Sequence, residues 1–189
     1  MTAQLIQSLP TRDIEALKLM AKALPKNSIR NYGTVIGFVG GKAYITDGYG
    51  LLELTLDESF DRSASFTVTR EFFNSQVPYP SVGHVLPESG EALSSDVLSS
   101  FLELPKALGK KEVKGLRLFY QPHRVSLALE SSWPEGASGF NPWVLRKLIE
   151  ALPKGSKVTS GLINDGTLRL FVESGIQKFS IVICEVKKP

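Results

Sequence analysis

The sequence contains a single cysteine, Cys184, and two histidines among its 189 residues. One cysteine excludes an internal disulfide and argues against a cysteine-rich metal site. No run of about 18 apolar residues occurs, so we expect no membrane-spanning helix and no membrane partner. The first residues also lack the cationic start and long apolar stretch that are typical of a signal peptide. We therefore expect a cytoplasmic protein.

Motifs for catalysis are absent as well. Asp47 is followed by Gly48 and Asp57 lies nearby, but an Asp-Gly pair favours a turn over a catalytic acid. Each of the two histidines, His84 and His123, lies in a loop that contains proline, and Cys184 lies in the predicted terminal strand without a partnering histidine. No Gly-x-x-x-x-Gly-Lys-Ser/Thr phosphate loop occurs. We expect no enzyme activity, no bound metal and no cofactor.

What the sequence does contain is typical of a folded protein. Hydrophobic residues make up 42% and charged residues 22% of the chain. Its length is enough for one large domain or two small domains with a real core. The formal net charge of +3 permits contact with a polyanion without requiring it.

The periodicity of apolar residues predicts helices that alternate with groups of strands. The first helix starts at an expected N-cap, Thr11, and stops at Pro25, and the last starts at the Asn141-Pro142 pair. A middle helix covers residues 96–104. We expect turns at 40–41 and 164–166, one or two helical turns over 70–76, and strands at 2–8 (weak), 34–39, 43–46, 51–56, 63–69, 114–120, 124–130, 158–163, 167–173 and 179–186, with a weak strand entering Asn141.

An internal repeat organises these elements. The first helix ends in Ala-Leu-Pro-Lys-Asn-Ser (23–28), and the last ends in Ala-Leu-Pro-Lys-Gly-Ser (151–156). Strands follow each helix, so a unit of one helix plus strands occurs about three times. Because an amphipathic helix buries its apolar stripe against a sheet, these units predict an α+β architecture.

Cationic residues recur on and just after the predicted helices. Lys18, Lys22 and Lys26 are spaced by four residues, on the side of the first helix away from its apolar stripe. One interpretation is a solvated helix face. The other is sequence-independent contact with phosphates, which requires the repeats to turn their cations toward one surface.

Four segments resemble the bacterial DNA polymerase III beta subunit, the sliding clamp. They are Ile29-Arg30-Asn31-Tyr32, Thr46-Asp47-Gly48-Tyr49-Gly50-Leu51, Tyr79-Pro80-Ser81-Val82-Gly83-His84-Val85-Leu86-Pro87 and the stretch from Asp96 to Phe119. The third of these segments is similar to the linker between the clamp's middle and C-terminal domains. Gly139-Phe140-Asn141 and the following helix and strands resemble the end of the clamp. The resemblance covers nearly all of residues 8–187 and implies the DNA-clamp fold.

The resemblance also implies a domain organisation and several departures from the family. A reduced clamp domain covers residues 1–78, a linker covers 79–90 and a full clamp domain covers 91–189, so the first clamp domain has no counterpart. Gly50 and His84 stand where the family has arginine, and Ile183-Cys184-Glu185-Val186 replaces the usual Met-Pro-Met-Arg ending. Pro105 is expected to shorten the middle helix relative to the family.

The family's function then implies two sets of site residues. Duplex DNA would be contacted without sequence specificity by Lys18, Lys22, Lys26, Asn27, Arg30, Tyr32, Lys110, Lys111, Arg146, Lys147 and Lys154. Short peptides of a DNA polymerase or other partners would bind a hydrophobic groove formed by Thr46, Gly48, Tyr49, Leu51, Pro80, His84, Val85, Val182 and Ile183.

Two alternatives to a ring-forming clamp remain open at this point. A chain of this length encircles a duplex only as a homo-oligomer, so a monomer that rests on DNA through its basic face is one alternative. The positive net charge favours it, since bacterial clamps are typically acidic. The other is a clamp-mimicking regulatory protein that occupies partner peptides. The groove residues also have a simpler interpretation, as core between the sheets.

Overall fold

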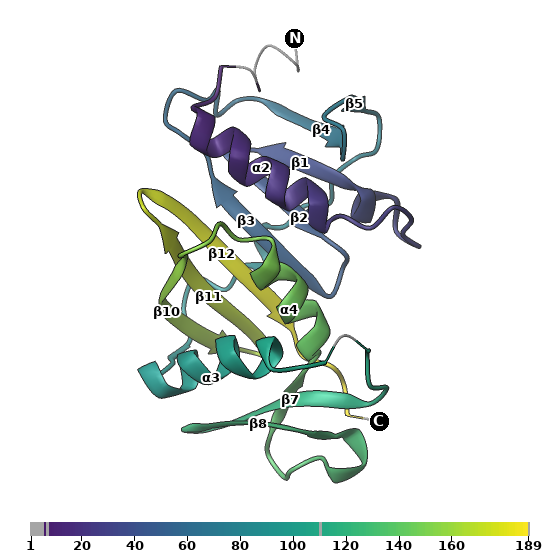
Figure 1. Cartoon of the computed structure of the whole chain (residues 1–189), viewed down its shortest axis with the longest axis vertical. Coiled ribbons are helices and arrows are strands. Elements are labelled where there is room, and N and C mark those ends of the chain that lie inside the picture. The colour runs from purple at the N-terminus through teal and green to yellow at the C-terminus, as the bar shows by residue number, and fades with distance from the viewer. Residues whose placement is uncertain (1–5, 7, 110, 189) are drawn as a thin grey trace.

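The computed structural model describes residues 6, 8–109 and 111–188 and shows a long twisted antiparallel sheet with helices on one face (Figure 1). The helices are α2 (Thr11–Ala23), α3 (Ser95–Lys106) and α4 (Pro142–Glu150), with short 3-10 turns η1 (Asn31–Thr34), η2 (Gly83–Val85) and η3 (Glu130–Ser132). The strands are β1 (Val35–Val39), β2 (Lys42–Thr46), β3 (Gly50–Thr55), β4 (Ser65–Thr69), β5 (Asn74–Ser75), β6 (Glu91–Ala92), β7 (Leu116–Gln121), β8 (Arg124–Leu129), β9 (Ser138–Phe140), β10 (Lys157–Asn164), β11 (Thr167–Ser174) and β12 (Gln177–Cys184).

Within the described residues the larger sheet has nine strands in the order β5-β4-β1-β2-β3-β12-β11-β10-β6. Its centre is the antiparallel pair β3–β12, in which Leu51 lies opposite Val182. This pair, the seam, joins strands that are far apart in the sequence, so the sheet runs without a break between the predicted segments 1–78 and 91–189. The smaller sheet, β8-β7-β9, packs against α3 and α4 at the lower end of Figure 1.

Helices α2, α3 and α4 lie on one face of the larger sheet. α4 lies over the seam, where it contacts β3 and β12, and it also packs against α2 and α3. Gly50 permits this close approach, because a Cβ atom there would lie 2.5 Å from Val144 Cγ1 and 2.9 Å from Leu148 Cδ1 of α4. Since side chains alternate along a strand, Leu52 and Ile181 face the helices, whereas Leu51 and Val182 face the opposite, outer face.

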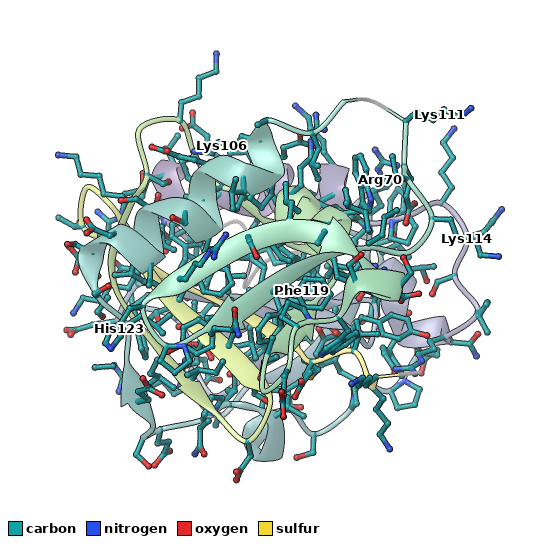
Figure 2. All side chains as sticks on the ribbon, turned by 90° about the horizontal axis from the view of Figure 1, so that it is seen from below. Arg70, Lys106, Lys111, Lys114, Phe119 and His123 are labelled. Atoms are coloured by element: carbon teal, nitrogen blue, oxygen red, sulfur yellow. The ribbon has the colours of Figure 1, made fainter. Side chains whose placement is uncertain are left out.

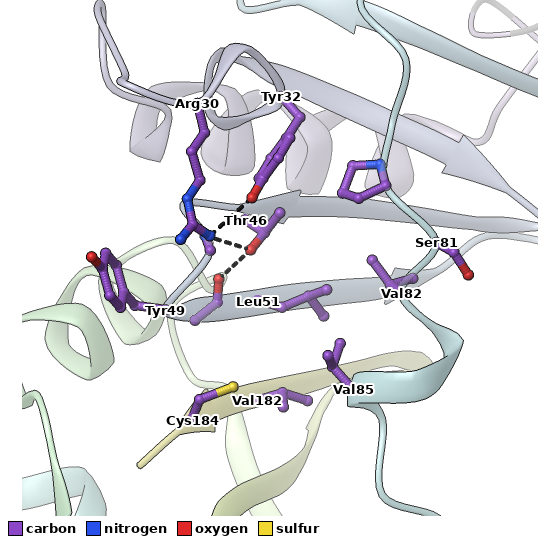
Figure 3. A pocket seen from close by; sticks show the side chains of 13 residues that line it. Arg30, Tyr32, Thr46, Tyr49, Leu51, Ser81, Val82, Val85, Val182 and Cys184 are labelled. Atoms are coloured by element: carbon purple, nitrogen blue, oxygen red, sulfur yellow. Dashed lines mark hydrogen bonds between the residues drawn. The ribbon is translucent and has the colours of Figure 1, made fainter. Parts of the chain in front are cut away.

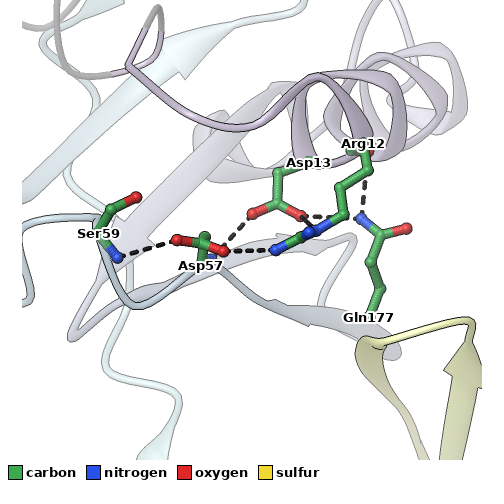
Figure 4. Close-up of polar contacts among 5 residues, drawn as sticks. All are labelled: Arg12, Asp13, Asp57, Ser59 and Gln177. Atoms are coloured by element: carbon green, nitrogen blue, oxygen red, sulfur yellow. Dashed lines mark hydrogen bonds and ion pairs between the residues drawn. The ribbon is translucent and has the colours of Figure 1, made fainter.

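A buried polar cluster ties the start of α2 to the far end of the seam (Figure 4). Asp13, which is 1% exposed, accepts hydrogen bonds from the Gln177 side-chain amide at 3.0 Å and the Asp57 backbone N–H at 2.9 Å. Arg12 forms ion pairs with both Asp13 and Asp57. Because these residues come from α2, the segment after β3 and the start of β12, the cluster fixes the helix across both halves of the sheet.

Most of the predicted elements are confirmed. Helix-plus-strand units occur three times, as α2 with β1–β3, α3 with β7–β8 and α4 with β10–β12. Asn141 caps α4, since its Oδ1 accepts the backbone N–H groups of Trp143 and Val144. The predicted turns at 40–41 and 164–166 contain residues with positive φ, as tight hairpin turns require.

Two local predictions are wrong, and one predicted helix end is misplaced. Thr11 is the first helical residue and not the N-cap, because the Pro10 carbonyl already accepts the first helical hydrogen bonds. Residues 70–76 form a turn and β5 instead of a helix, because the chain reverses to pair with β4. The end of α3 lies two residues beyond the predicted end at 104, since the helix continues through Pro105 to Lys106. The strand expected at 2–8 falls largely outside the described residues.

Candidate partner-binding groove and cationic helix face

Residues 79–87, the strap, cross the outer face of the larger sheet. Tyr79 lies against Gly37 of β1, where a Cβ atom would collide with the aromatic ring. Val82 and Leu86 pack onto a small apolar cluster that includes Leu51 and Val182. Further hydrogen bonds hold the end of the strap, including one from Arg169 Nη1 to the Pro87 carbonyl at 3.1 Å.

A cavity of about 180 Å³, the groove, opens between the strap, the β2–β3 turn and β12 (Figure 3). Its floor comes from the outer face of the seam and its wall from the strap. Apolar side chains dominate the interior, and hydroxyl and aromatic groups lie at the edge. The lining residues are Arg30, Tyr32, Thr46, Gly48, Tyr49, Gly50, Leu51, Pro80, Ser81, Val82, Val85, Val182 and Cys184.

The β2–β3 turn is shaped by its own side chains. Asp47 Oδ1 accepts the backbone N–H groups of Tyr49 at 2.9 Å and Gly50 at 3.0 Å. Thr46 Oγ1 accepts the Gly48 N–H and donates to the Gly50 carbonyl. Gly48 has a φ of 88°, which favours glycine. The turn therefore holds the Tyr49 ring, 62% exposed, at the edge of the groove.

Arg30 approaches the same edge from the segment after α2. Its Nη1 donates to the Tyr32 hydroxyl at 2.9 Å, and its guanidinium carbon lies 5.4 Å from the centre of the Tyr49 ring. A Cβ atom on Gly48 would collide with this guanidinium, so the missing side chain at Gly48 makes room for Arg30. Arg30 and Tyr32, which the sequence analysis placed with the DNA-contacting residues, both line the groove.

The structure brings most of the predicted groove residues together. Thr46, Gly48, Tyr49, Leu51, Pro80, Val85 and Val182 all line the cavity. Ile183 does not, because it alternates with Val182 and points into the core beneath the helices. The side chain of His84 lies outside the described part of the chain. Ser81, Val82 and Cys184 were missed, and the two-residue spacing of Cys184 from Val182 was a signal that both share one face.

Several polar side chains are buried on the outer face of the larger sheet. Glu53 pairs with Lys42 at 3.0 Å and with Arg169 at 3.6 Å on the outer face. Burial raises the pKa of Tyr44, and the neighbouring Glu53 carboxylate raises it further. Burial likewise raises the pKa of Tyr79. Both phenols therefore stay neutral near pH 7 and serve packing.

The residues considered for catalysis are engaged or isolated. The Asp47 carboxylate accepts backbone hydrogen bonds within its turn, and His123 lies exposed in the β7–β8 turn with a φ of 68°. Across residues 6, 8–109 and 111–188 no group of three or more histidine, cysteine or acidic residues could hold a metal ion. None of the helices in this part of the chain has the length and apolar character that crossing a bilayer requires.

On the opposite side, the helix face carries exposed cations. Lys18 and Lys22 of α2 are exposed, as are Lys26, Lys111 and Lys154 in the loops after the helices, and no ion pair involves these lysines within the described residues. Asn27, a neutral member of the predicted DNA-contacting set, is exposed beside Lys26. Lys147 of α4 lines a small crevice with Leu24 and Pro25 at the end of α2. Figure 2 shows Lys106, Lys111 and Lys114 at the periphery of the molecule, while Phe119 lies inside.

Arg146 and Lys110 differ from the other members of the predicted DNA-contacting set. Arg146 is held within the protein, because it pairs with Glu150 at 2.7 Å and donates to the carbonyls of Leu108 and Gly109. It positions the segment after α3 and is only partly exposed. Lys110 lies outside the described residues.

Comparison with known proteins identifies the fold. No protein-family model and no curated protein matches the sequence. Among solved structures, the sliding clamp of Bacillus subtilis matches with a TM-score of 0.60 and 11% identity, covering 96% of this chain and 64% of that one. The clamp of Pseudomonas aeruginosa bound to griselimycin matches with a TM-score of 0.55 and 14% identity, covering 92% and 63%.

The beta subunit of Streptococcus pyogenes DNA polymerase matches with a TM-score of 0.56 and 15% identity, covering 95% of this chain and 67% of that one. The chain thus spans about two thirds of the length of these clamps, or slightly less. Its helices lie together on one face of a continuous sheet, and its groove lies under the strap on the other. This chain therefore has the α+β fold of the bacterial DNA polymerase III beta subunit, the DNA sliding clamp, in reduced form.

Proposed function

We propose that the chain is a sliding-clamp-like processivity factor for DNA replication, without enzymatic activity. Its helix face contacts duplex DNA non-specifically, its groove binds short peptides of a DNA polymerase or other partners, and copies of the chain associate into a ring. The observation that carries the proposal is the pairing of two opposite surfaces in a clamp fold. Exposed lysines lie on the helix side, and an apolar groove lies on the outer side.

The cationic helix face suits a protein that slides. Lysines such as Lys18 and Lys22 project from a rigid helix and form no ion pair with the described residues. Long ammonium side chains attract phosphates without reading bases, so the complex does not stop at one sequence. A few such contacts give affinity that falls steeply with salt, which is compatible with movement along the duplex.

DNA contact is tested by salt-dependent binding to duplex DNA. Replacing Lys18, Lys22 and Lys147 with glutamine should reduce the slope of log affinity against log salt by roughly one for each lysine. Lys178→Gln is the matched control, because Lys178 is exposed on the outer face of β12. Equal loss of affinity in the control and the triple variant would argue against the helix face.

Ring formation is tested by retention on circular and linearised DNA. A ring holds DNA by topology, so we expect the protein to stay on a closed circle and to be lost when the circle is cut. Light scattering with and without DNA should show self-association. A monomer under both conditions would rule against the ring.

The groove is tested by a charge placed in its floor. Leu51 is 3% exposed and lines the cavity, so Leu51→Lys should strongly weaken binding of a polymerase-tail peptide. Thr55→Lys is the control, because Thr55 lies on the same strand and face but is exposed outside the groove. Unchanged peptide affinity in folded Leu51→Lys would contradict a peptide-binding groove.

A further inference from the structure

Arg169 of β11 connects the strap to the seam through one buried guanidinium. Its Nη1 donates to the Pro87 carbonyl of the strap at 3.1 Å, and its Nη2 donates to Ser180 Oγ of β12 at 3.3 Å. The same Nη2 lies 3.6 Å from Glu53 Oε1 of β3, so both strands of the seam contact the guanidinium. Arg169 is 8% exposed and does not line the groove. Its contacts therefore determine how the strap is held and not which surface a partner meets.

The rest of the strap is held on the sheet by apolar packing. The backbone hydrogen bonds that the structure describes in the strap run from the Val85 N–H to the Val82 carbonyl and from the Leu86 N–H to the Gly83 carbonyl, so they close turns within the strap. The strap is a member of neither sheet. A segment without a ladder of hydrogen bonds opens at a lower cost than the strands beneath it. Apart from its apolar packing, the strap depends on the hydrogen bond that Arg169 donates.

The closed strap also leaves polar groups buried where it meets the sheet. Within the described residues, neither the Tyr79 hydroxyl nor Arg169 Nε has a hydrogen-bond partner. A buried polar group without a partner disfavours the state that buries it, because water satisfies the group once it is exposed. This cost opposes the closed position, which Arg169 and the packing of Val82 and Leu86 favour. A small change at Arg169 should therefore shift the balance between a closed and an open strap.

The chain just beyond the strap provides a fixed point for such a movement. Asn164 Nδ2 donates to the Ser89 carbonyl at 2.9 Å. A Cβ atom on Gly90 would lie 2.5 Å from the Ile163 carbonyl oxygen, so the chain packs tightly on β10 at this point. β6 follows and pairs with β10. This part of the chain stays on the sheet when the strap lifts.

We propose that the strap is a lid over the outer face of the sheet and that Arg169 is the positioning residue that latches it closed. When Arg169 Nη1 releases the Pro87 carbonyl, residues 79–87 lift and the chain pivots at Ser89, while the seam beneath stays paired. The lid opens without unfolding of the protein. This inference goes beyond the proposed function, because it requires neither DNA nor a bound peptide.

Thiol labelling of the full-length chain tests the lid. Val182 is 1% exposed and packs under Val82 and Leu86, so Val182→Cys in a Cys184→Ser background gives a single thiol that reacts when the strap opens. Val68→Cys is the matched control, because Val68 is equally buried but lies in the core beneath the helices, where a thiol reacts only on unfolding. We expect Val182→Cys to react roughly tenfold faster than Val68→Cys, or faster still. Equal rates would mean that the strap opens only when the protein unfolds, and would overturn the lid.

Arg169→Met tests the latch, because methionine keeps an unbranched side chain beside Phe171 but donates no hydrogen bond. It should raise the labelling rate of Val182→Cys roughly tenfold, as the loss of one charge-assisted hydrogen bond predicts, and that of Val68→Cys much less. Ser180→Ala removes the other hydrogen bond of the guanidinium and leaves the one to the strap, so it should hardly change the labelling of Val182→Cys.

The outcomes separate a latch from a general stabilising role. If Arg169→Met raises both labelling rates by the same factor, Arg169 stabilises the whole fold and the latch is wrong. An unchanged rate for Val182→Cys would overturn it as well. If Arg169→Met does not fold, Arg169→Lys keeps the charge beside Glu53 but lacks the fork that bonds Pro87 and Ser180 together. Arg169→Lys should raise the rate for Val182→Cys severalfold, and an unaltered rate would contradict the latch.

Discussion

Gly50 lies at the point where α4 crosses the seam, and adding one methyl group there should destabilise the protein. The new Cβ of Gly50→Ala would lie 2.5 Å from Val144 Cγ1 and 2.9 Å from Leu148 Cδ1. Leu148 can move its terminal methyl group, but Val144 is branched at Cβ and can relieve the contact only if α4 shifts. The substitution therefore presses α4 away from the two strands that join the halves of the sheet.

The expected cost follows from two opposing effects. Overpacking a close contact costs about 1–3 kcal/mol, while replacing glycine with alanine recovers about 0.4–1 kcal/mol by restricting the unfolded chain. The net loss in the free energy of unfolding is then about 1–2 kcal/mol. For a chain of this length it corresponds to a fall in Tm of roughly 2–8 °C. Thermal and urea unfolding followed by circular dichroism measure both quantities.

Two further variants identify the cause of the loss. In a Val144→Ala background the added methyl group has room, so the cost of Gly50→Ala should be nearly abolished, with a coupling energy of at least about 0.5 kcal/mol. Gly83→Ala in the strap is the control, because nothing lies within 4 Å of the new Cβ, and it should change stability by less than about 0.5 kcal/mol. The reasoning is refuted if Gly50→Ala costs the same in both backgrounds.

Three other predictions concern the polar cluster and the groove. Asp13→Ala should lower the free energy of unfolding, measured by urea titration, by about 3 kcal/mol. The substitution removes two hydrogen bonds to a buried carboxylate and leaves the Gln177 amide with a weaker partner. Asp13→Asn should cause a smaller loss. Hydrogen bonds from the residues two positions later lower the pKa of Asp57 and Asp61. The stabilisation that these two ionised carboxylates give the folded state is complete above the carboxyl pKa of the unfolded chain, and it is lost as the pH falls through their lower pKa values in the folded state. Thermal unfolding should therefore show a Tm that drops in acid and stays constant between pH 6 and 8. Burial raises the pKa of the Cys184 thiol, so alkylation of Cys184 should become fast only at a higher pH than for a free cysteine. Because Cys184 lines the groove, a bound peptide should slow this alkylation. An alkylation rate that does not change with bound peptide would contradict the groove's position.

Local elements could be predicted from the sequence because their signals are local. Asn141-Pro142 begins a helix through the cap it supplies, and the Gly-Gly and Asn-Asp-Gly turns depend on φ values that few other residues adopt. The apolar period of each helix marks its buried side without reference to a partner. The error at 70–76 arose where pairing with β4 outweighed local preference.

The sequence by itself thus determined the helix-plus-strand units, their order and most of the groove-lining residues. Only the tertiary structure decided which strand face each residue occupies. The alternation of side chains along a strand defines two faces, and the packing of α4 over the β3–β12 pair determines which of them is the inner face. That selection buries Ile183 and leaves Cys184 at the groove. It also places Arg30 at the edge of the groove, because its guanidinium lies against Gly48, eighteen positions away in the chain, through a contact with no local signal.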